Sequence, residues 1–160
     1  MPTMKSVMKL ELDEAKVMIE AAKKAAEEVN ALESICIVDD GGYVIALERM
    51  NGGRITGPEI AIAKAFTASG HKRSTHLFNQ PGGPATTTGE AFGIHVMLPG
   101  KFAIFVGGFP IVVNGAVIGG VGVSGGNGEQ DTAVGTAALR ALQEYLGAEY
   151  EVMTQADIKK

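Results

Sequence analysis

Two histidines and a glutamate lie in one stretch of the chain that is rich in proline and glycine. His71 and His76 precede Glu90, and the run Gln80-Pro81-Gly82-Gly83-Pro84 lies between them. An imidazole titrates near neutral pH, so His71, His76 and Glu90 are candidate catalytic residues that could move protons. The two histidines are five residues apart and do not share a helical face, so a metal site built from them would need a non-helical turn. For His71 the alternative is an ordinary surface position.

A glycine-rich run, residues 120–126, is the second candidate site. It contains the spacings G-x-G-x-x-G and G-x-S-x-G, which are typical of dinucleotide binding and of hydrolase nucleophiles. Both matches are weak, because only one predicted helix follows the run and no histidine follows Ser124 to act as its base. The glycines instead indicate a close approach of the backbone to a ligand or a helix. We therefore expect any catalysis to depend on residues 71–90 and not on Ser124.

Several other polar residues are candidates for binding a ligand. Asp131 lies in the first turn of the predicted last helix, where backbone amides could hold an anionic group. His95 lies in a strand-like stretch and is either a half-buried polar residue or a single axial ligand for a haem iron. The full set of candidate ligand-binding residues is Arg49, Glu59, Lys64, His95, Gly107, Gly108, Ser124, Gly125, Gly126 and Asp131.

Four helices are predicted to position these side chains. Apolar residues recur at helical spacing from Leu12 to a stop near Asn30, and Asp13 is a possible cap. A second helix is predicted from Pro58 to about Gly70, because proline suits a first helical turn and glycine a helix end. A short helix is expected over 74–78, and the last one runs from about Glu129 to Gly147.

Five strands are predicted, over residues 34–38, 43–49, 102–106, 109–113 and 116–123. The run 39–42 and the pair Asn114-Gly115 are typical hairpin turns, and Asn-Gly is the strongest such signal in the chain. Strands and helices do not alternate regularly. We therefore predict an α+β fold with a five-stranded antiparallel sheet and flanking helices.

Composition narrows the classes to which the protein can belong. With 160 residues, of which 46% are hydrophobic, the chain predicts one folded domain over 10–147, an N-terminal extension over 1–9 and a tail over 148–160. The net charge of −4 disfavours nucleic acid as a partner. Cys36 is the only cysteine, which excludes an intrachain disulfide. No stretch is apolar enough for a signal peptide or a membrane span, so we expect no membrane partner and a cytoplasmic location.

Several blocks of sequence, in one order, carry a resemblance to a known family. They are Val38-Asp39-Asp40-Gly41-Gly42, Glu48-Arg49-Met50, Ala61-Ile62-Ala63-Lys64-Ala65, Gly107-Gly108-Phe109-Pro110-Ile111, and residues 119–126 followed by Glu129-Gln130-Asp131. With these blocks the chain resembles the GlcG/HbpS-like family, to which the C-terminal domain of PduO-type corrinoid adenosyltransferases is related. The resemblance runs from about Leu10 to Leu146.

This resemblance implies a profilin-like α-β domain that assembles into dimers or octamers, with haem bound by some members. Two features depart from the haem-binding members: there is no secretion signal, and the first helix contains no histidine that could match their haem ligand. The adenosyltransferase activity belongs to another domain and is not implied. Residues 71–98 look individual to this protein and are the expected source of specificity.

Two functional hypotheses follow. The first is a homo-oligomeric protein associated with small-molecule catabolism, which binds a small organic ligand or a tetrapyrrole, haem among them. Its pocket would lie between the middle helix, the Gly107-Gly108 turn and residues 124–131. The second is a cofactor-independent lyase, isomerase or cyclase acting on a small aromatic or carboxylated catabolite. In that case Lys64 or Arg49 would hold the carboxylate.

Overall fold

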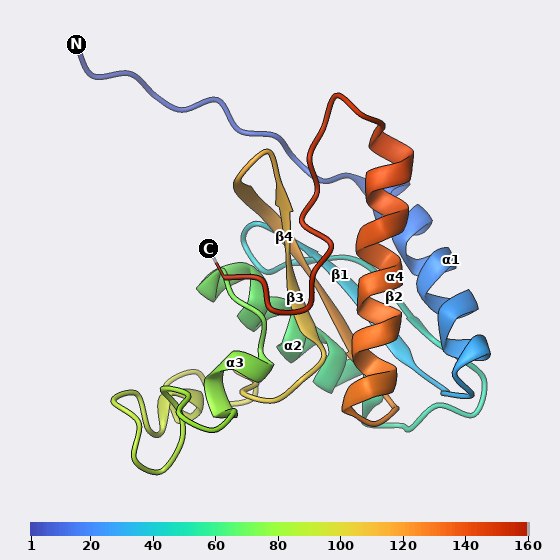
Figure 1. Ribbon diagram of the computed structural model, residues 1–160, viewed down its shortest axis with the longest axis vertical. Coiled ribbons are helices and arrows are strands. Elements are labelled where there is room, and N and C mark those ends of the chain that lie inside the picture. The colour runs from blue at the N-terminus through green and yellow to red at the C-terminus, as the bar shows by residue number, and fades with distance from the viewer. Residues whose placement is uncertain (160) are drawn as a thin grey trace.

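The chain folds into a sheet with helices on both faces (Figure 1). The structure is a computed structural model, and it describes residues 1–159. In chain order the elements are α1 (Leu12–Glu28), β1 (Ser34–Asp39), β2 (Val44–Arg49), α2 (Gly57–His71), α3 (His76–Asn79), the 3-10 turn η1 (Ile94–Val96), β3 (Gly108–Val113), β4 (Ala116–Ser124) and α4 (Gly128–Leu146). The predicted α+β class is confirmed.

The sheet is antiparallel, with the strand order β2-β1-β4-β3. The two hairpins predicted from sequence are both present. Asn114 and Gly115 have φ angles of 49° and 76°, the left-handed conformation that a tight two-residue hairpin turn needs. The two hairpins pair through β1 and β4, which places the buried strand β1 in the centre and leaves β2 at an edge.

Alternate residues of β1 enter different layers of the core. Ile35 and Ile37 pack with α1 and α4 in the larger apolar cluster, whereas Cys36 and Val38 pack against Ala61 and Ala65 of α2. This follows from the period of two along a strand. Burial raises the pKa of the Cys36 thiol to about 12, so the thiol is uncharged and inert, as its apolar surroundings in the sequence predict.

The prediction of a fifth strand over 102–106 is wrong, and the sheet has four strands. This segment passes beside α2, where the amide of Ala103 donates to Oγ1 of Thr67 (2.9 Å). The same hydroxyl donates to the carbonyl of Ala63 within α2 (2.8 Å), and the carbonyl of Lys101 lies 3.3 Å from it. The segment rejoins the sheet only at Gly107, whose carbonyl accepts from the amide of Val123. A helix side chain therefore supplies hydrogen bonds that a neighbouring strand would otherwise provide.

Two smaller expectations also need correction. His95 does not lie in a strand, because residues 94–96 form the 3-10 turn η1 between glycine-containing turns. Helix α1 begins at Leu12, so Asp13 lies inside its first turn and is not its cap. The cap is Glu11, whose amide donates to the side chain of Glu14 (3.0 Å).

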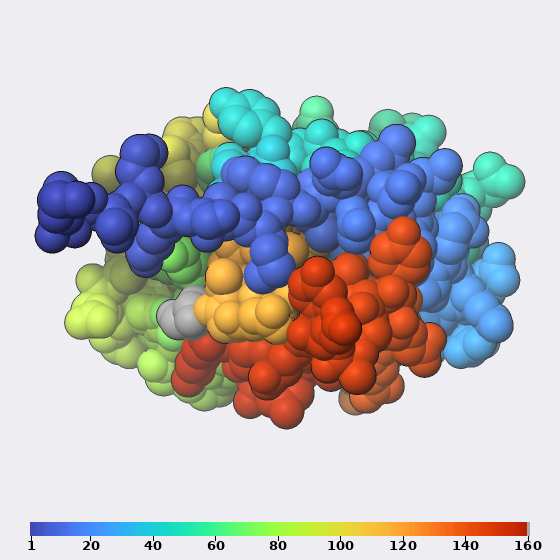
Figure 2. All heavy atoms as spheres, turned by 90° about the horizontal axis from the view of Figure 1, so that it is seen from above, coloured from blue at the N-terminus to red at the C-terminus, as the bar shows by residue number. Residues whose placement is uncertain are grey.

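The two ends of the chain differ in how they pack. Residues 1–7 run away from the body over its upper side and carry exposed Met1, Met4 and Val7 (Figures 1 and 2). Residues 148–159 instead turn back along β3, and Val152 and Ile158 are buried in the core. Among the described residues no helix is long and apolar enough to cross a membrane.

Candidate functional site

A buried ion pair joins α2 to α4. Nζ of Lys64 lies 3.0 Å from Oδ2 of Asp131 and donates to the carbonyl of Val123 at 2.6 Å. Both side chains are almost fully buried, at 3% and 4% exposure. Burial lowers the pKa of Lys64, and the Asp131 carboxylate opposes that shift. Each of these buried charges offsets the desolvation cost of the other, because either one alone would be unpaired in the low-dielectric interior.

A second carboxyl group, that of Glu33, adjoins this pair. The amide of Gly126 donates both to Oε2 of Glu33 (3.1 Å) and to Oδ1 of Asp131 (3.0 Å), so the two carboxyl groups meet at one N–H. Oε1 of Glu33 is buried and has no hydrogen-bond partner within residues 1–159. Burial and the neighbouring Asp131 raise the pKa of Glu33 to about 8. The Glu33 carboxyl group therefore gives up its proton less readily than an exposed glutamate does.

Glycines make room for these charged groups. Gly107 has a φ of +124°, and a Cβ built there would lie 2.6 Å from Nζ of Lys64. A Cβ at Gly126 would lie 2.7 Å from Oε1 of Glu33, and one at Gly125 would lie 2.8 Å from Oε2. The middle helix, the Gly107-Gly108 turn and residues 124–131 thus meet, as expected. The side chains of Lys64, Glu33 and Asp131 are buried where these segments meet.

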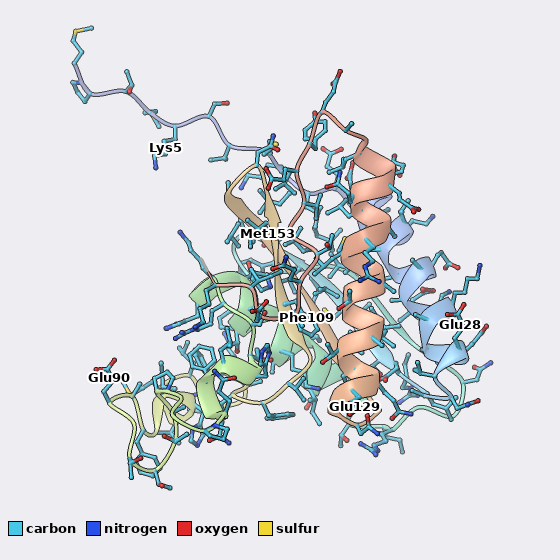
Figure 3. All side chains as sticks on the ribbon, viewed as in Figure 1. Lys5, Glu28, Glu90, Phe109, Glu129 and Met153 are labelled. Atoms are coloured by element: carbon cyan, nitrogen blue, oxygen red, sulfur yellow. The ribbon has the colours of Figure 1, made fainter. Side chains whose placement is uncertain are left out.

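An open groove lies beside this buried cluster, at the N-terminal end of α4. It has a volume of about 590 Å³ and is lined by His76, Val106, Gly128, Glu129, Thr132, Ala133 and Ala156. Its lining comes from α3, the turn before β3, the first turns of α4 and the tail. Figure 3 shows Glu129 at this end of α4. The groove lies within the usual size of small-molecule sites, roughly 300–1,000 Å³.

His76 is the histidine that faces this groove. It is half-buried, and its Nδ1 is buried with no hydrogen-bond partner in the described part of the chain. Burial lowers its pKa, and the carboxylate of Asp157 opposes the shift. The imidazole is therefore neutral at pH 7, the form that ligates metal ions.

The other two histidines lie elsewhere. The ring of His71 packs edge-on against Phe78 and Phe102, with centroids 5.1 and 5.6 Å apart. Its pKa is lowered, by burial first and by Arg73 second. His95 is exposed on η1, and the lining of the groove that contains His76 does not include it. Of the three histidines, His76 alone is in the lining of this groove.

The remaining candidates do not share one site. Glu90 is exposed on the loop after α3 (Figure 3). With Arg73 and residues 82–84 it lines a polar depression of about 400 Å³. Arg49 is exposed at the end of β2, in a polar cleft of about 600 Å³ against α1. Glu59 is exposed in the first turn of α2. Ser124 is buried at the end of β4, opposite Ser34.

Sequence reasoning missed Glu33, which belongs to the buried cluster. The signal that could have found it is a glutamate placed immediately before the apolar run of β1, a position where a charge is poorly tolerated without a partner. Within residues 1–159 no three histidine, cysteine, aspartate or glutamate side chains gather in a way that could hold a metal ion.

Comparisons with known proteins place this geometry in a family. The model of the family described as "Haem degrading protein HbpS-like" matches residues 10–140. An uncharacterized 15.0 kDa protein of Citrobacter freundii, from the dhaT-dhaS intergenic region, is 35% identical over 81% of this chain and 89% of its own length. Protein GlcG of Escherichia coli K12 is 35% identical over 76% of this chain and 85% of its own length.

The chain is also similar to one part of a larger enzyme. It is 31% identical to the corrinoid adenosyltransferase PduO of Citrobacter freundii over 88% of this chain, but over only 41% of that protein. Among solved structures, a PduOC:heme complex has a TM-score of 0.77 and 30% identity, and the match covers 92% of this chain and 99% of that one. On the family match and these identities, the chain belongs to the HbpS-like family, which confirms the resemblance seen in its sequence.

Proposed function

We propose that this protein binds a small, largely apolar ligand of the tetrapyrrole class, haem among them, in the groove beside α4. The observation that carries the proposal is His76, a neutral imidazole on the wall of an otherwise mainly apolar groove of about 590 Å³. The related PduOC structure is that of a complex with haem, which supports the same ligand class.

The residues of the groove fit such a ligand. Val106, Ala133 and Ala156 supply apolar surface for a flat ring system. The first amides of α4, those of Gly128 and Glu129, have no intrahelical acceptor and suit the carboxylate of a propionate-like group. Haem, when bound, would supply an iron that binds imidazole nitrogen, and His76 is the residue of the groove that would hold it.

A titration with haemin tests this proposal. Wild type should develop a Soret band shifted from that of free haemin, and His76→Ala should lose that shift. His71→Ala and His95→Ala are matched controls, because their imidazoles lie away from the groove and should leave the spectrum unchanged. A wild-type spectrum identical to that of free haemin would refute the proposal. Loss of the shift in His95→Ala instead would move the ligand site to η1.

The lyase, isomerase or cyclase hypothesis has no comparable support. Of the residues predicted to move protons, His76 lines the groove and Glu90 lines the polar depression, whereas the ring of His71 packs against Phe78 and Phe102. Lys64 is buried against Asp131 rather than open to a carboxylate substrate. Proton transfer by these residues as one group would need them within reach of a single substrate.

Self-association is a further part of the proposal. Its support is a mean hydropathy of +0.14 together with four exposed apolar side chains within seven residues, those of Phe92, Val96, Met97 and Leu98. Light scattering at micromolar concentration should report a dimer or larger assembly. A monomer would contradict it.

A further inference from the structure

The side chain of Gln143 forms hydrogen bonds that fix the segment after α4. Nε2 of Gln143 donates to the carbonyls of Gly147 (3.1 Å) and Tyr150 (2.8 Å), and its Oε1 accepts from the amide of Val152 (2.8 Å). Both the donor and the acceptor of this amide group are thereby directed to the chain that follows the helix. Figure 1 shows the segment running down beside β3.

Two anchors hold this segment against the body. At the first, the amide of Asn114 donates to the carbonyl of Glu151 (2.8 Å) and the amide of Met153 donates to the carbonyl of Val112 (3.0 Å). At the second, Ile158 is buried and its carbonyl accepts from the amide of Ser74 (3.0 Å). The second anchor therefore lies two residues before His76 and fixes the backbone that carries it.

Between the two anchors the chain forms one wall of the groove. Ala156 lines the groove together with His76 and Val106. No hydrogen bond from residues 154–157 to the rest of the described chain is seen. The wall is therefore held by its two anchors and by the packing of Ala156 against the core, and its bulk at the groove is set by the side chain at position 156.

We infer that residues 151–159 are the specificity-determining wall of the groove: Ala156 sets the space for the ligand, and Ile158 positions His76. This inference rests on the proposed function for the identity of the ligand, but not for its structural part. The methyl group of Ala156 leaves the groove open to a flat apolar ring, whereas an indole at the same position would occupy that space. The family match ends at residue 140, so this wall is contributed by a part of the chain beyond that match.

The first arm of the test changes the bulk of the wall. Haemin and 8-anilinonaphthalene-1-sulfonate, an apolar anion, are titrated into wild type, Ala156→Trp and the matched small variant Ala156→Ser. Ala156→Trp should weaken the binding of both probes by about 10-fold or more, whereas Ala156→Ser should stay within about 2-fold of wild type. Circular dichroism and urea unfolding confirm that each variant is folded. Equal affinities for all three proteins would overturn the role of Ala156.

The second arm needs no ligand. In ¹H–¹³C spectra the imidazole resonances of His76 should shift in Ile158→Ala, whereas those of His95, exposed on η1, should not. Unchanged His76 resonances in a folded Ile158→Ala would overturn the positioning role of Ile158. If haemin fails to bind wild type while the sulfonate probe and the His76 resonances respond as expected, the proposed function fails and the inference about the wall stands.

Discussion

The ammonium of Lys64 lies 3.0 Å from Oδ2 of Asp131, which links two residues 67 positions apart in the interior of the protein. The pair joins the middle of α2 to the first turn of α4, on opposite faces of the sheet. The groove lies at that same end of α4, where Gly128, Glu129 and Thr132 belong to its lining.

Removing the ammonium group of Lys64 should destabilise the folded protein. In Lys64→Met the carboxylate of Asp131 would remain buried without its partner, and we expect the free energy of unfolding to fall by about 3–5 kcal/mol. The double variant Lys64→Met/Asp131→Leu, which removes both charges, should recover a large part of this loss. Urea denaturation of the four proteins in the cycle measures the effect. A double variant no more stable than Lys64→Met would argue against the ion pair as the cause.

Glu33 should make stability depend on pH. Its pKa is raised to about 8 in the folded state from 4.5, so the folded protein holds a proton that the unfolded chain releases between these values. The resulting stability is fully present below about pH 4.5 and is lost as pH rises through 8, at up to roughly 1.4 kcal/mol per pH unit.

Glu33→Gln keeps a neutral side chain and removes this titration. Urea unfolding between pH 6 and 9 should therefore show a smaller decline in stability for Glu33→Gln than for wild type. Glu59→Gln, on the exposed first turn of α2, is the control and should follow wild type. Parallel curves for Glu33→Gln and wild type would show that Glu33 is already ionised at neutral pH.

His76 should titrate below the ordinary histidine value. Burial lowers its pKa from 6.5, so its imidazole stays neutral until the pH falls below that value. A histidine ¹H–¹³C titration from pH 8 to 4.5 measures this midpoint directly. Asp157→Asn should lower the midpoint further, because the opposing carboxylate is removed. A midpoint at or above 6.5 in wild type would contradict the buried setting of the ring.

The hydrogen bond to Thr67 should stabilise the position of residues 102–106, the segment that does not join the sheet. In Thr67→Val the buried amide of Ala103 loses its acceptor, which should cost about 1–3 kcal/mol of unfolding free energy. Hydrogen exchange at the Ala103 amide should accelerate with it. Thr88→Val, at an exposed loop position, provides the comparison and should change neither quantity.

Much of the fold could be predicted from local patterns. The apolar period of α1, the Asn114-Gly115 turn and the acidic first turn of α4 act over a few residues, and each predicted its element correctly. The prediction of a strand over 102–106 was wrong because the amide of Ala103 donates to the hydroxyl of Thr67 and not to a neighbouring strand. Thr67 lies 36 residues earlier in the chain than Ala103. Strand propensity does not contain that information.

The candidate site was less accessible to sequence reasoning. The sequence indicated both Lys64 and Asp131 as candidates, but their pairing and the nearness of Glu33 arise only when α2, α4 and the residue before β1 meet. The backbone two residues before His76 is hydrogen-bonded to Ile158, a residue of the tail. Contacts of such long sequence separation leave no periodic signal in the chain.

Helix α2 rests on β4 with no side chain between them at two points. A Cβ at Gly122 would overlap the carbonyl oxygen of Ala61, and one at Gly120 would overlap that of Ala65. Gly122→Ala should therefore destabilise the protein by roughly 3 kcal/mol or more. Gly70→Ala, on the same helix with nothing within 4 Å of the added methyl, should be neutral or stabilising by up to about 1 kcal/mol in thermal unfolding.

This direct backbone contact between α2 and β4 also limits which substitutions the protein can accept during evolution. The distance between α2 and β4 is set by main-chain atoms, which no substitution can make smaller. The residues around Lys64 can therefore accept few substitutions without a change in that distance. New ligand preferences would have to arise in the lining of the groove, where Val106, Ala133 and Ala156 can change size without moving α2 relative to the sheet. The molecule thereby separates a part that must stay constant from a part that is free to diversify.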